Sequence, residues 1–132
     1  MIIDTSAIIA ILRNEPQAAF CALVIAEADK FRVSAVNYLE AAVVIDASDD
    51  PIASRRFDEF VKTAQISIEA VTQTQAQIAR SAYRDFGRGC GHHAKLNFGD
   101  YFAYALAKSM DEPLLFKGND FIHTDITSVS PR

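Results

Sequence analysis

The sequence predicts an α/β protein, a three-layer α/β/α sandwich in which helices cover both faces of a mostly parallel central sheet. Short apolar segments with strand character alternate with longer segments of helical periodicity along the chain. The chain has 132 residues, of which 50% are hydrophobic and 23% charged, a composition that suits one folded core and argues against disorder. We therefore expect a single domain over residues 1–132, without repeats or linkers.

Five short segments are predicted to be strands. The first is apolar from the first residue and ends directly before Asp4. The third alternates apolar and polar residues, whereas the fourth is a continuous apolar run that follows Pro113. The predicted strands span residues 1–3, 31–34, 66–71, 113–116 and 126–129.

Six segments between these strands have helical spacing and recognisable ends. N-cap residue types at residues 4–6 precede the first helix, and Pro16 opens the second. Asp50 and Pro51 precede the fourth helix, and Gly87 ends the fifth helix. The predicted helices span residues 7–12, 16–28, 35–47, 53–64, 74–86 and 98–109, with a polar loop over residues 90–97.

Composition and charge exclude several classes of protein. Thirteen Lys and Arg residues against 17 Asp and Glu give a net charge of −4, which excludes a protein that coats nucleic acid through a broad basic surface but not an enzyme that holds it locally. No apolar run approaches the ~18 residues of a membrane-spanning helix. The first residues lack the basic flank of a secretory signal. Cys21 and Cys90 form no metal-ligand spacing and no disulfide framework. We therefore expect a cytoplasmic protein with no membrane association.

Two acids lie where a parallel sheet is expected to form a site, beyond the carboxyl ends of its strands. Asp4 directly ends the first strand, although it also suits the N-cap of the helix that follows. Asp120 follows the predicted strand that ends at Phe116, although an ordinary turn residue is the alternative. Asp125, five residues further on, is a weaker candidate for a supporting role.

Two further acids lie on apolar helices. Glu40 is in the segment 38–45, whose apolar residues on almost all sides predict a helix buried on most faces, with a narrow solvent-facing stripe as the alternative. Asp100 is the first acid of a strongly apolar helix, although it also suits the first turn after an N-cap at Asn97.

A cluster of these carboxylates predicts a metal site. Carboxylates grouped without Lys or Arg repel one another, and their pKa values rise. Oxygen ligands with no Cys or His spacing indicate Mg²⁺ or Mn²⁺ rather than Zn²⁺. A site of this kind most often serves phosphoryl or phosphodiester chemistry.

Four motifs carry a resemblance to a known family. In chain order they are Met1-Ile2-Ile3-Asp4-Thr5-Ser6-Ala7, Asn37-Tyr38-Leu39-Glu40-Ala41, Leu96-Asn97-Phe98-Gly99-Asp100 and Gly118-Asn119-Asp120-Phe121. The sequence resembles the PIN-domain ribonucleases and, more narrowly, the VapC-type toxins of bacterial toxin–antitoxin pairs. The resemblance covers nearly the whole chain, from the first residue to Asp125.

The resemblance implies a compact PIN-like α/β/α fold, Mg²⁺- or Mn²⁺-dependent endoribonuclease activity, inhibition by a VapB-type antitoxin and, commonly, a homodimer. It implies that Asp4, Glu40, Asp100 and Asp120 form the catalytic and metal-binding quartet, with Asp4 and Asp100 as direct ligands. Our mechanistic hypothesis is hydrolysis of RNA by an activated water, which leaves 5′-phosphate and 3′-hydroxyl ends. Supporting roles are implied for Thr5, Ser6, Asn97 and Asp125.

Several other side chains have more than one interpretation. The paired His92 and His93 are expected to be plain loop residues rather than zinc ligands. The apolar face of the helix over residues 53–64 is either core or a groove for a partner, and an antitoxin is expected to bring an Arg or Lys to the acids. Candidate contacts to the RNA backbone are Arg13, Arg55, Arg56, Lys62, Arg84, Arg88, Lys95 and Lys117.

Three rival functions are weighed against the nuclease. A receiver-type signalling domain needs an Asp at the end of a middle strand, where Thr72 stands, and only Lys117 favours it. A phosphatase of the haloacid-dehalogenase type needs a second Asp two residues after Asp4, where Ser6 stands. A non-catalytic RNA- or protein-binding module with the same fold remains open.

Overall fold

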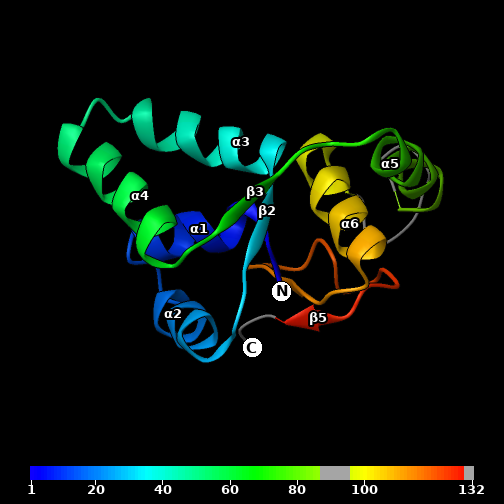
Figure 1. Cartoon of the computed structure of the whole chain (residues 1–132), viewed down its shortest axis with the longest axis horizontal. Helices are drawn as coiled ribbons and strands as arrows, with labels where there is room; N and C mark the ends of the chain where they lie inside the picture. Colours follow the sequence, from blue (N-terminus) through cyan, green and yellow to red (C-terminus); the bar gives the residue numbers. More distant parts are fainter. Residues whose placement is uncertain (87–95, 130–132) are drawn as a thin grey trace.

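The computed structural model describes residues 1–86 and 96–129, and within them five strands form one parallel sheet (Figure 1). The strands lie in the order β3-β2-β1-β4-β5, and every neighbouring pair is parallel. Each strand falls within a predicted one, so the strand predictions are confirmed. The strands are β1 (Ile2–Ile3), β2 (Arg32–Ser34), β3 (Ser67–Glu69), β4 (Leu114–Leu115) and β5 (Ser128–Val129).

Helices connect the strands, and the predicted helices are confirmed with small differences at their ends. The first begins at Thr5 rather than at residue 7, because the Asp4 side chain accepts a hydrogen bond from the Ser6 N–H and so caps it. None of the helices in the described part of the chain is long and apolar enough to cross a membrane. The helices are α1 (Thr5–Leu12), α2 (Ala18–Glu27), α3 (Ala35–Asp46), α4 (Pro51–Thr63), α5 (Gln73–Phe86) and α6 (Phe98–Met110).

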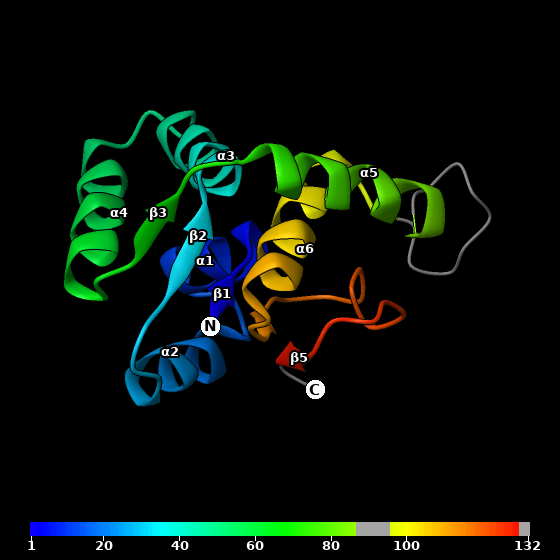
Figure 2. The same ribbon diagram turned by 45° about the vertical axis from the view of Figure 1, so that its right-hand side comes forward.

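The sheet separates two hydrophobic cores, which makes the predicted three layers. Because successive side chains of a strand point to opposite faces, Ile2 and Leu114 belong to one core and Ile3 and Leu115 to the other. The first core is covered by α5 and α6, and the second by helices α1 to α4 (Figure 2). The α/β/α prediction is therefore confirmed.

The strand order reverses beside β1. From β1 the chain proceeds outward to β2 and β3 and then returns to place β4 on the other side of β1. The register pairs Ile2 with Leu114 and Ile3 with Leu115, so β1 and β4 end side by side. Ligand sites of parallel sheets form beyond the carboxyl ends of strands at such a reversal. Asp4 directly follows β1 at this position.

The expectation that α3 is buried on most faces is wrong. Only Asn37, Ala41 and Ile45, one stripe at four-residue spacing, are buried along α3, and Glu40 is exposed. Leu39 and Val43 are 61% and 57% exposed, respectively. The sequence misleads because apolar residues occur on every side of this helix, whereas the fold packs only one of its sides against the rest of the protein.

The apolar face of α4 is part of the core. Phe57 is 2% exposed and stacks at a tilt against Tyr38, with 5.5 Å between the ring centroids. Phe60 and Val61 are half-buried against the same core. The alternative left open by the sequence, core or partner groove, is therefore decided for Phe57 in favour of the core.

This packing generates a stability prediction. Phe57→Ala removes a fully packed ring and is expected to lower the free energy of unfolding by about 3–5 kcal/mol, because lost burial and a residual cavity add up. Ile52→Ala, a truncation of an exposed side chain on the same helix, is expected to change it by about 0.5 kcal/mol at most. Urea denaturation followed by circular dichroism measures both. Equal losses in the two variants would contradict the assignment of Phe57 to the core.

Candidate active site

Asp4 is a buried carboxylate fixed by the start of α1. Its Oδ2 accepts hydrogen bonds from the Ser6 N–H at 3.0 Å and the Ser6 hydroxyl at 2.6 Å. The Ser6 hydroxyl in turn accepts a hydrogen bond from the Lys117 N–H at 3.0 Å, directly after β4. Ser6 therefore ties Asp4 to the neighbouring strand end. Asp4 therefore caps α1 and also lies at the strand end where a site is expected, so the two interpretations of this residue are compatible.

Asp100 is held by a capping box at the start of α6. The Asn97 side chain accepts a hydrogen bond from the Asp100 N–H at 3.0 Å, and the Asp100 carboxylate accepts one from the Asn97 N–H at 2.9 Å. Asp100 is only 6% exposed. Asn97 thus fixes the Asp100 carboxylate at the buried end of the helix.

Glu40 reaches the same helix end from α3. A Cβ atom on Gly99 would lie 2.5 Å from Glu40 Oε2, so the carboxylate occupies the space that any larger residue at position 99 would fill. Asn37, one turn earlier on α3, donates a hydrogen bond from Nδ2 to the Gly99 carbonyl at 3.0 Å. The Thr5 hydroxyl donates to the Asn37 carbonyl at 3.1 Å. Thr5 therefore braces the start of α3 rather than Asp4 itself.

Asp120 approaches the cluster from the turn after β4. Gly118 has φ of +98°, a left-handed conformation that glycine adopts readily and that carries the chain toward Asp120. Asp120 is exposed, yet its negative charge contributes to the raised pKa values of both Asp4 and Asp100. The fold thus brings together all four acids singled out in the sequence.

The electrostatics of the cluster favour protonated carboxyls in the absence of a cation. Burial is the largest cause and raises the pKa of Asp100 to about 8, with the negative charges of Asp4 and Asp120 adding to it. Burial also raises the pKa of Asp4 to about 6, against the hydrogen bonds from Ser6, while the charges of Glu40 and Asp120 add to the rise.

No lysine or arginine in residues 1–86 and 96–129 pairs with any of the four acids. Lys117, the nearest along the chain to Asp120, instead donates from Nζ to Glu15 Oε1 at 2.7 Å. Buried carboxylates without a cationic partner are costly unless they hold a proton or a metal ion. The cluster therefore has an uncompensated requirement for positive charge.

The donor chemistry fits a hard divalent cation. The side chains offer carboxylate and hydroxyl oxygens, the ligands that Mg²⁺ and Mn²⁺ prefer. In their present positions, no three His, Cys, Asp or Glu side chains of the described residues are grouped so as to hold a metal ion. Mg²⁺ commonly keeps several waters and uses only one or two protein carboxylates, so a pair such as Asp4 and Asp100 is compatible with it.

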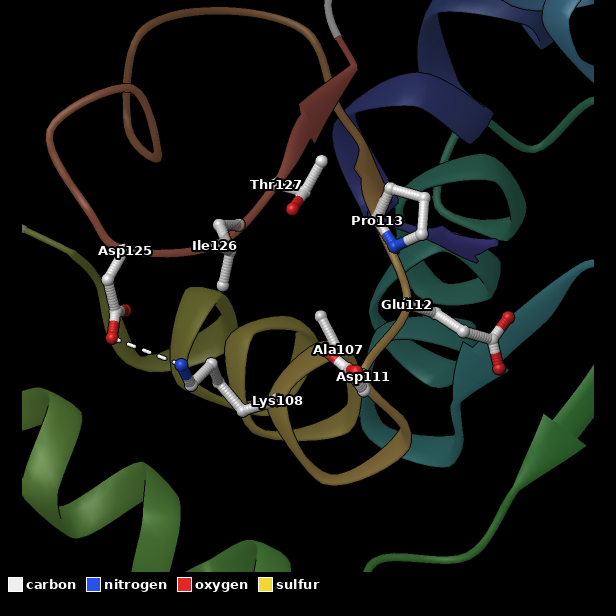
Figure 3. Close-up of a pocket in the computed structure, with 8 residues that line it drawn as sticks. All are labelled: Ala107, Lys108, Asp111, Glu112, Pro113, Asp125, Ile126 and Thr127. Atoms are coloured by element: carbon white, nitrogen blue, oxygen red, sulfur yellow. Dashed lines mark hydrogen bonds and ion pairs between the residues drawn. The ribbon is translucent and has the colours of Figure 1, made fainter.

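Asp125 is not brought to this cluster. It lies beside a polar pocket of about 100 Å³ near the far end of α6 (Figure 3), where its carboxylate accepts hydrogen bonds from the Tyr104 hydroxyl and from Lys108 Nζ at 3.1 Å. Partial burial raises the pKa of Asp125, but these two hydrogen bonds outweigh it and lower the pKa. The contacts fix the segment before β5 to α6, which is a structural role.

Two residues of the site, Asn37 and Gly99, belong to the motifs quoted above, but the sequence alone suggested no role for either. Asn37 is fully buried and joins α3 to α6, and Gly99 makes room for Glu40. The sequence signal for their roles was weak: Asn37 is a polar residue and Gly99 a small one, each near the start of an apolar helix. The loop residues considered earlier, Arg88, Cys90, His92, His93 and Lys95, lie outside the described residues.

Comparison with known proteins identifies the family to which a chain with this fold and this cluster of acids belongs. Residues 1–126 match the PIN domain family. The chain therefore belongs to the PIN-domain family, as the motifs predicted, and the receiver-type and phosphatase alternatives are set aside.

Its relatives place the chain among the VapC proteins of that family. Ribonuclease VapC28 of Mycobacterium tuberculosis is 56% identical over 126 residues, which cover 96% of this chain and 95% of the relative. Ribonuclease VapC42 of the same organism is 47% identical over 126 residues, which cover 96% of each chain. The crystal structure of VapBC2 from Rickettsia felis, bound to a promoter DNA fragment, shares the fold with a TM-score of 0.79, 11% identity and coverage of 99% of this chain and 98% of that one.

The raised pKa of Asp100 generates a prediction about stability and pH. Without metal, the folded protein keeps a proton on Asp100 that the unfolded chain has released above about pH 4. The free energy of unfolding is therefore expected to fall as the pH rises toward 8, by on the order of 1 kcal/mol per unit. Asp100→Asn cannot titrate and is expected to lose this part of the slope.

Urea denaturation in EDTA between about pH 5 and pH 8 measures the effect as the difference between the wild type and Asp100→Asn. Asp111→Asn is the matched control, because Asp111 is an exposed acid at the other end of α6 in a left-handed conformation that Asn tolerates. Parallel pH profiles for the wild type and Asp100→Asn would show that burial does not raise this pKa.

Proposed function

We propose that this chain is a metal-dependent endoribonuclease, the toxin of a type II toxin–antitoxin pair. The observation that carries the proposal is the convergence of Asp4, Glu40, Asp100 and Asp120 at one sheet edge, with no described Lys or Arg to neutralise them. Its support is the identity of 47–56% to VapC ribonucleases over nearly the full chain. The whole of residues 1–132 is taken as the one nuclease domain.

The proposed cofactor is Mg²⁺ or Mn²⁺, held by Asp4 and Asp100 with Glu40 and Asp120 contributing directly or through water. When bound, such an ion supplies a water of lowered pKa and neutralises charge that develops on the phosphate. Each carboxylate comes from a different segment of the chain, and Ser6 and Asn97 hold two of them by hydrogen bonds. This arrangement fixes the donors before RNA arrives.

The surroundings of Asp4, Asp100 and Glu40 suit them to different parts of the hydrolysis. Asp4 and Asp100 are buried and fixed, which suits ligands, whereas Glu40 is exposed and lies over the α6 terminus, where it can accept the proton of the attacking water. Attack of water at phosphorus breaks the bond to the 3′ oxygen. The products are 5′-phosphate and 3′-hydroxyl ends, and a 2′,3′-cyclic phosphate would contradict this route.

Two protein partners are proposed, an antitoxin that binds at the four acids and a second copy of the chain. An antitoxin of the VapB type is proposed to inhibit the enzyme by bringing an Arg or Lys to the four acids, because a cation there replaces the missing charge. The chain is proposed to act as a homodimer in the cytoplasm, where its RNA substrate and antitoxin are made. A non-catalytic RNA-binding module is the second candidate, since four acids in place do not by themselves establish turnover.

Cleavage of total RNA tests the proposal. Purified protein free of antitoxin is expected to cleave RNA with Mg²⁺ or Mn²⁺ and to stop in EDTA. Asp100→Asn is expected to lower the rate by about a hundred-fold or more, because it removes a metal-binding carboxylate. Asp111→Asn, with the same change at an exposed position of the same helix, is expected to keep the full rate.

The controls separate the nuclease from its alternatives. Cleavage that survives Asp100→Asn would point to a contaminant or to another site. Absence of cleavage by protein that binds Mg²⁺ would favour the non-catalytic module.

A further inference from the structure

An apolar pocket lies between α5 and α6, outside the acidic cluster. Its volume is about 320 Å³, and its walls are the rings of Tyr83, Phe98, Tyr101 and Phe102, with Arg80 as the charged residue among the described residues that line it. The chemistry proposed above uses none of these side chains. The volume lies within the range of roughly 300–1,000 Å³ that is typical of ligand sites.

The rings contact one another edge to face in two pairs. Phe98 and Phe102 have centroids 5.1 Å apart with planes at 73°, and Tyr83 and Tyr101 are 6.0 Å apart at 87°. Phe98 is 73% exposed and Tyr83 is 49% exposed. Large aromatic rings gathered on a surface, rather than scattered singly, mark a place where something binds.

The pocket and the acids share one helix end. Phe98 is the first residue of α6 and Asp100 the third, so the two side chains leave nearly opposite sides of the same turn. A helix with its side chains is about 10–12 Å wide, which puts the pocket roughly one helix width from the Asp100 carboxylate. A few nucleotides of single-stranded RNA span that separation. Helix α5 runs alongside α6 and supplies the other wall (Figures 1 and 2).

We propose that this pocket receives one unstacked base of the RNA substrate, a few nucleotides from the scissile phosphate; the proposal rests on the ribonuclease function proposed above. Proteins recognise single-stranded RNA by stacking splayed bases on aromatic rings and on Arg guanidinium groups. Phe98, which is 73% exposed, offers its ring to the base, and Arg80 offers a cation for the base or for the adjoining phosphate. The pocket thereby fixes the register of the strand relative to the acids.

Charge favours RNA over a second copy of this chain as the occupant. The described charge at the pocket is positive, and Arg84 follows Arg80 one turn later on the exposed side of α5. RNA brings phosphates to these cations. A copy related by a two-fold axis brings the same patch, with its own positive charges, to the same place. The experiment below also tests whether a second copy of the chain covers the rings instead.

Short single-stranded RNAs with 2-aminopurine at successive positions are the probes, since this base loses fluorescence when it stacks. They are titrated with the Asp100→Asn variant in Mg²⁺, so that binding is measured without cleavage. The pocket is tested on this background with Phe98→Ala and Phe98→Tyr. Leu23→Ala, which truncates another exposed apolar side chain, 57% exposed, on α2 and away from the pocket, is the matched control.

Quenching that depends on the position of the probe is expected, with binding about ten-fold weaker in Phe98→Ala. Phe98→Tyr keeps the ring and is expected to bind like the parent, as is Leu23→Ala. In wild-type protein, Phe98→Ala is expected to raise KM for RNA about ten-fold while kcat changes less. A purely structural role for Phe98 would instead lower the thermal midpoint of the variant without this pattern.

Three results would contradict the proposal that the pocket binds a base. They are equal affinity and quenching in Phe98→Ala, no quenching at any position, and a halved molar mass of Phe98→Ala in light scattering, which would show that a second copy covers the rings. Failure of the nuclease is a separate result. If quenching requires Phe98 while the wild type cleaves no RNA, the base-binding pocket stands and the hydrolysis proposed above fails.

Discussion

The structure depends on one electrostatic conflict, the burial of Asp4 and Asp100 beside each other with no described lysine or arginine to neutralise them. Burial raises the pKa of both carboxyls, so the metal-free protein keeps a proton where a cation is expected to bind. A protein selected for stability alone would place apolar side chains there. The conflict is what distinguishes this sheet edge from the rest of the surface, and positive charge from a metal ion or from an antitoxin side chain would relieve it.

Contacts from the rest of the fold hold the acids close together. The reversal of strand order brings the ends of β1 and β4 together, and Ser6 links them through Asp4 and the Lys117 N–H. On the other side, Asn37 joins α3 to the first turn of α6, where Gly99 leaves room for Glu40. Because these links are hydrogen bonds between different elements, the acids cannot easily move apart to lower their repulsion. The aromatic pocket begins at the same turn of α6.

Much of this organisation could be predicted from the sequence, because strand alternation and helix ends have strong local signals. Asp4 and Asp100 are predicted as site residues because an acid that ends an apolar strand, or begins an apolar helix, stands out locally. Glu40 is predicted for a partly wrong reason: α3 is apolar on all sides, yet only one side is buried. The placement of Asp125 against Tyr104, and the pairing of Lys117 with Glu15, depend on the path of loops, which carry no periodic signal.

The most direct test of this account is the number of protons released when Mg²⁺ binds. Calorimetric titration near pH 7, repeated in buffers of different ionisation enthalpy, measures it independently of any RNA. Since burial keeps Asp100 protonated at this pH, we predict that each bound ion releases about one proton and that Asp100→Asn abolishes the release. Binding of Mg²⁺ without proton release, or with the same release in Asp100→Asn, would contradict the claim that an uncompensated buried carboxyl defines this site.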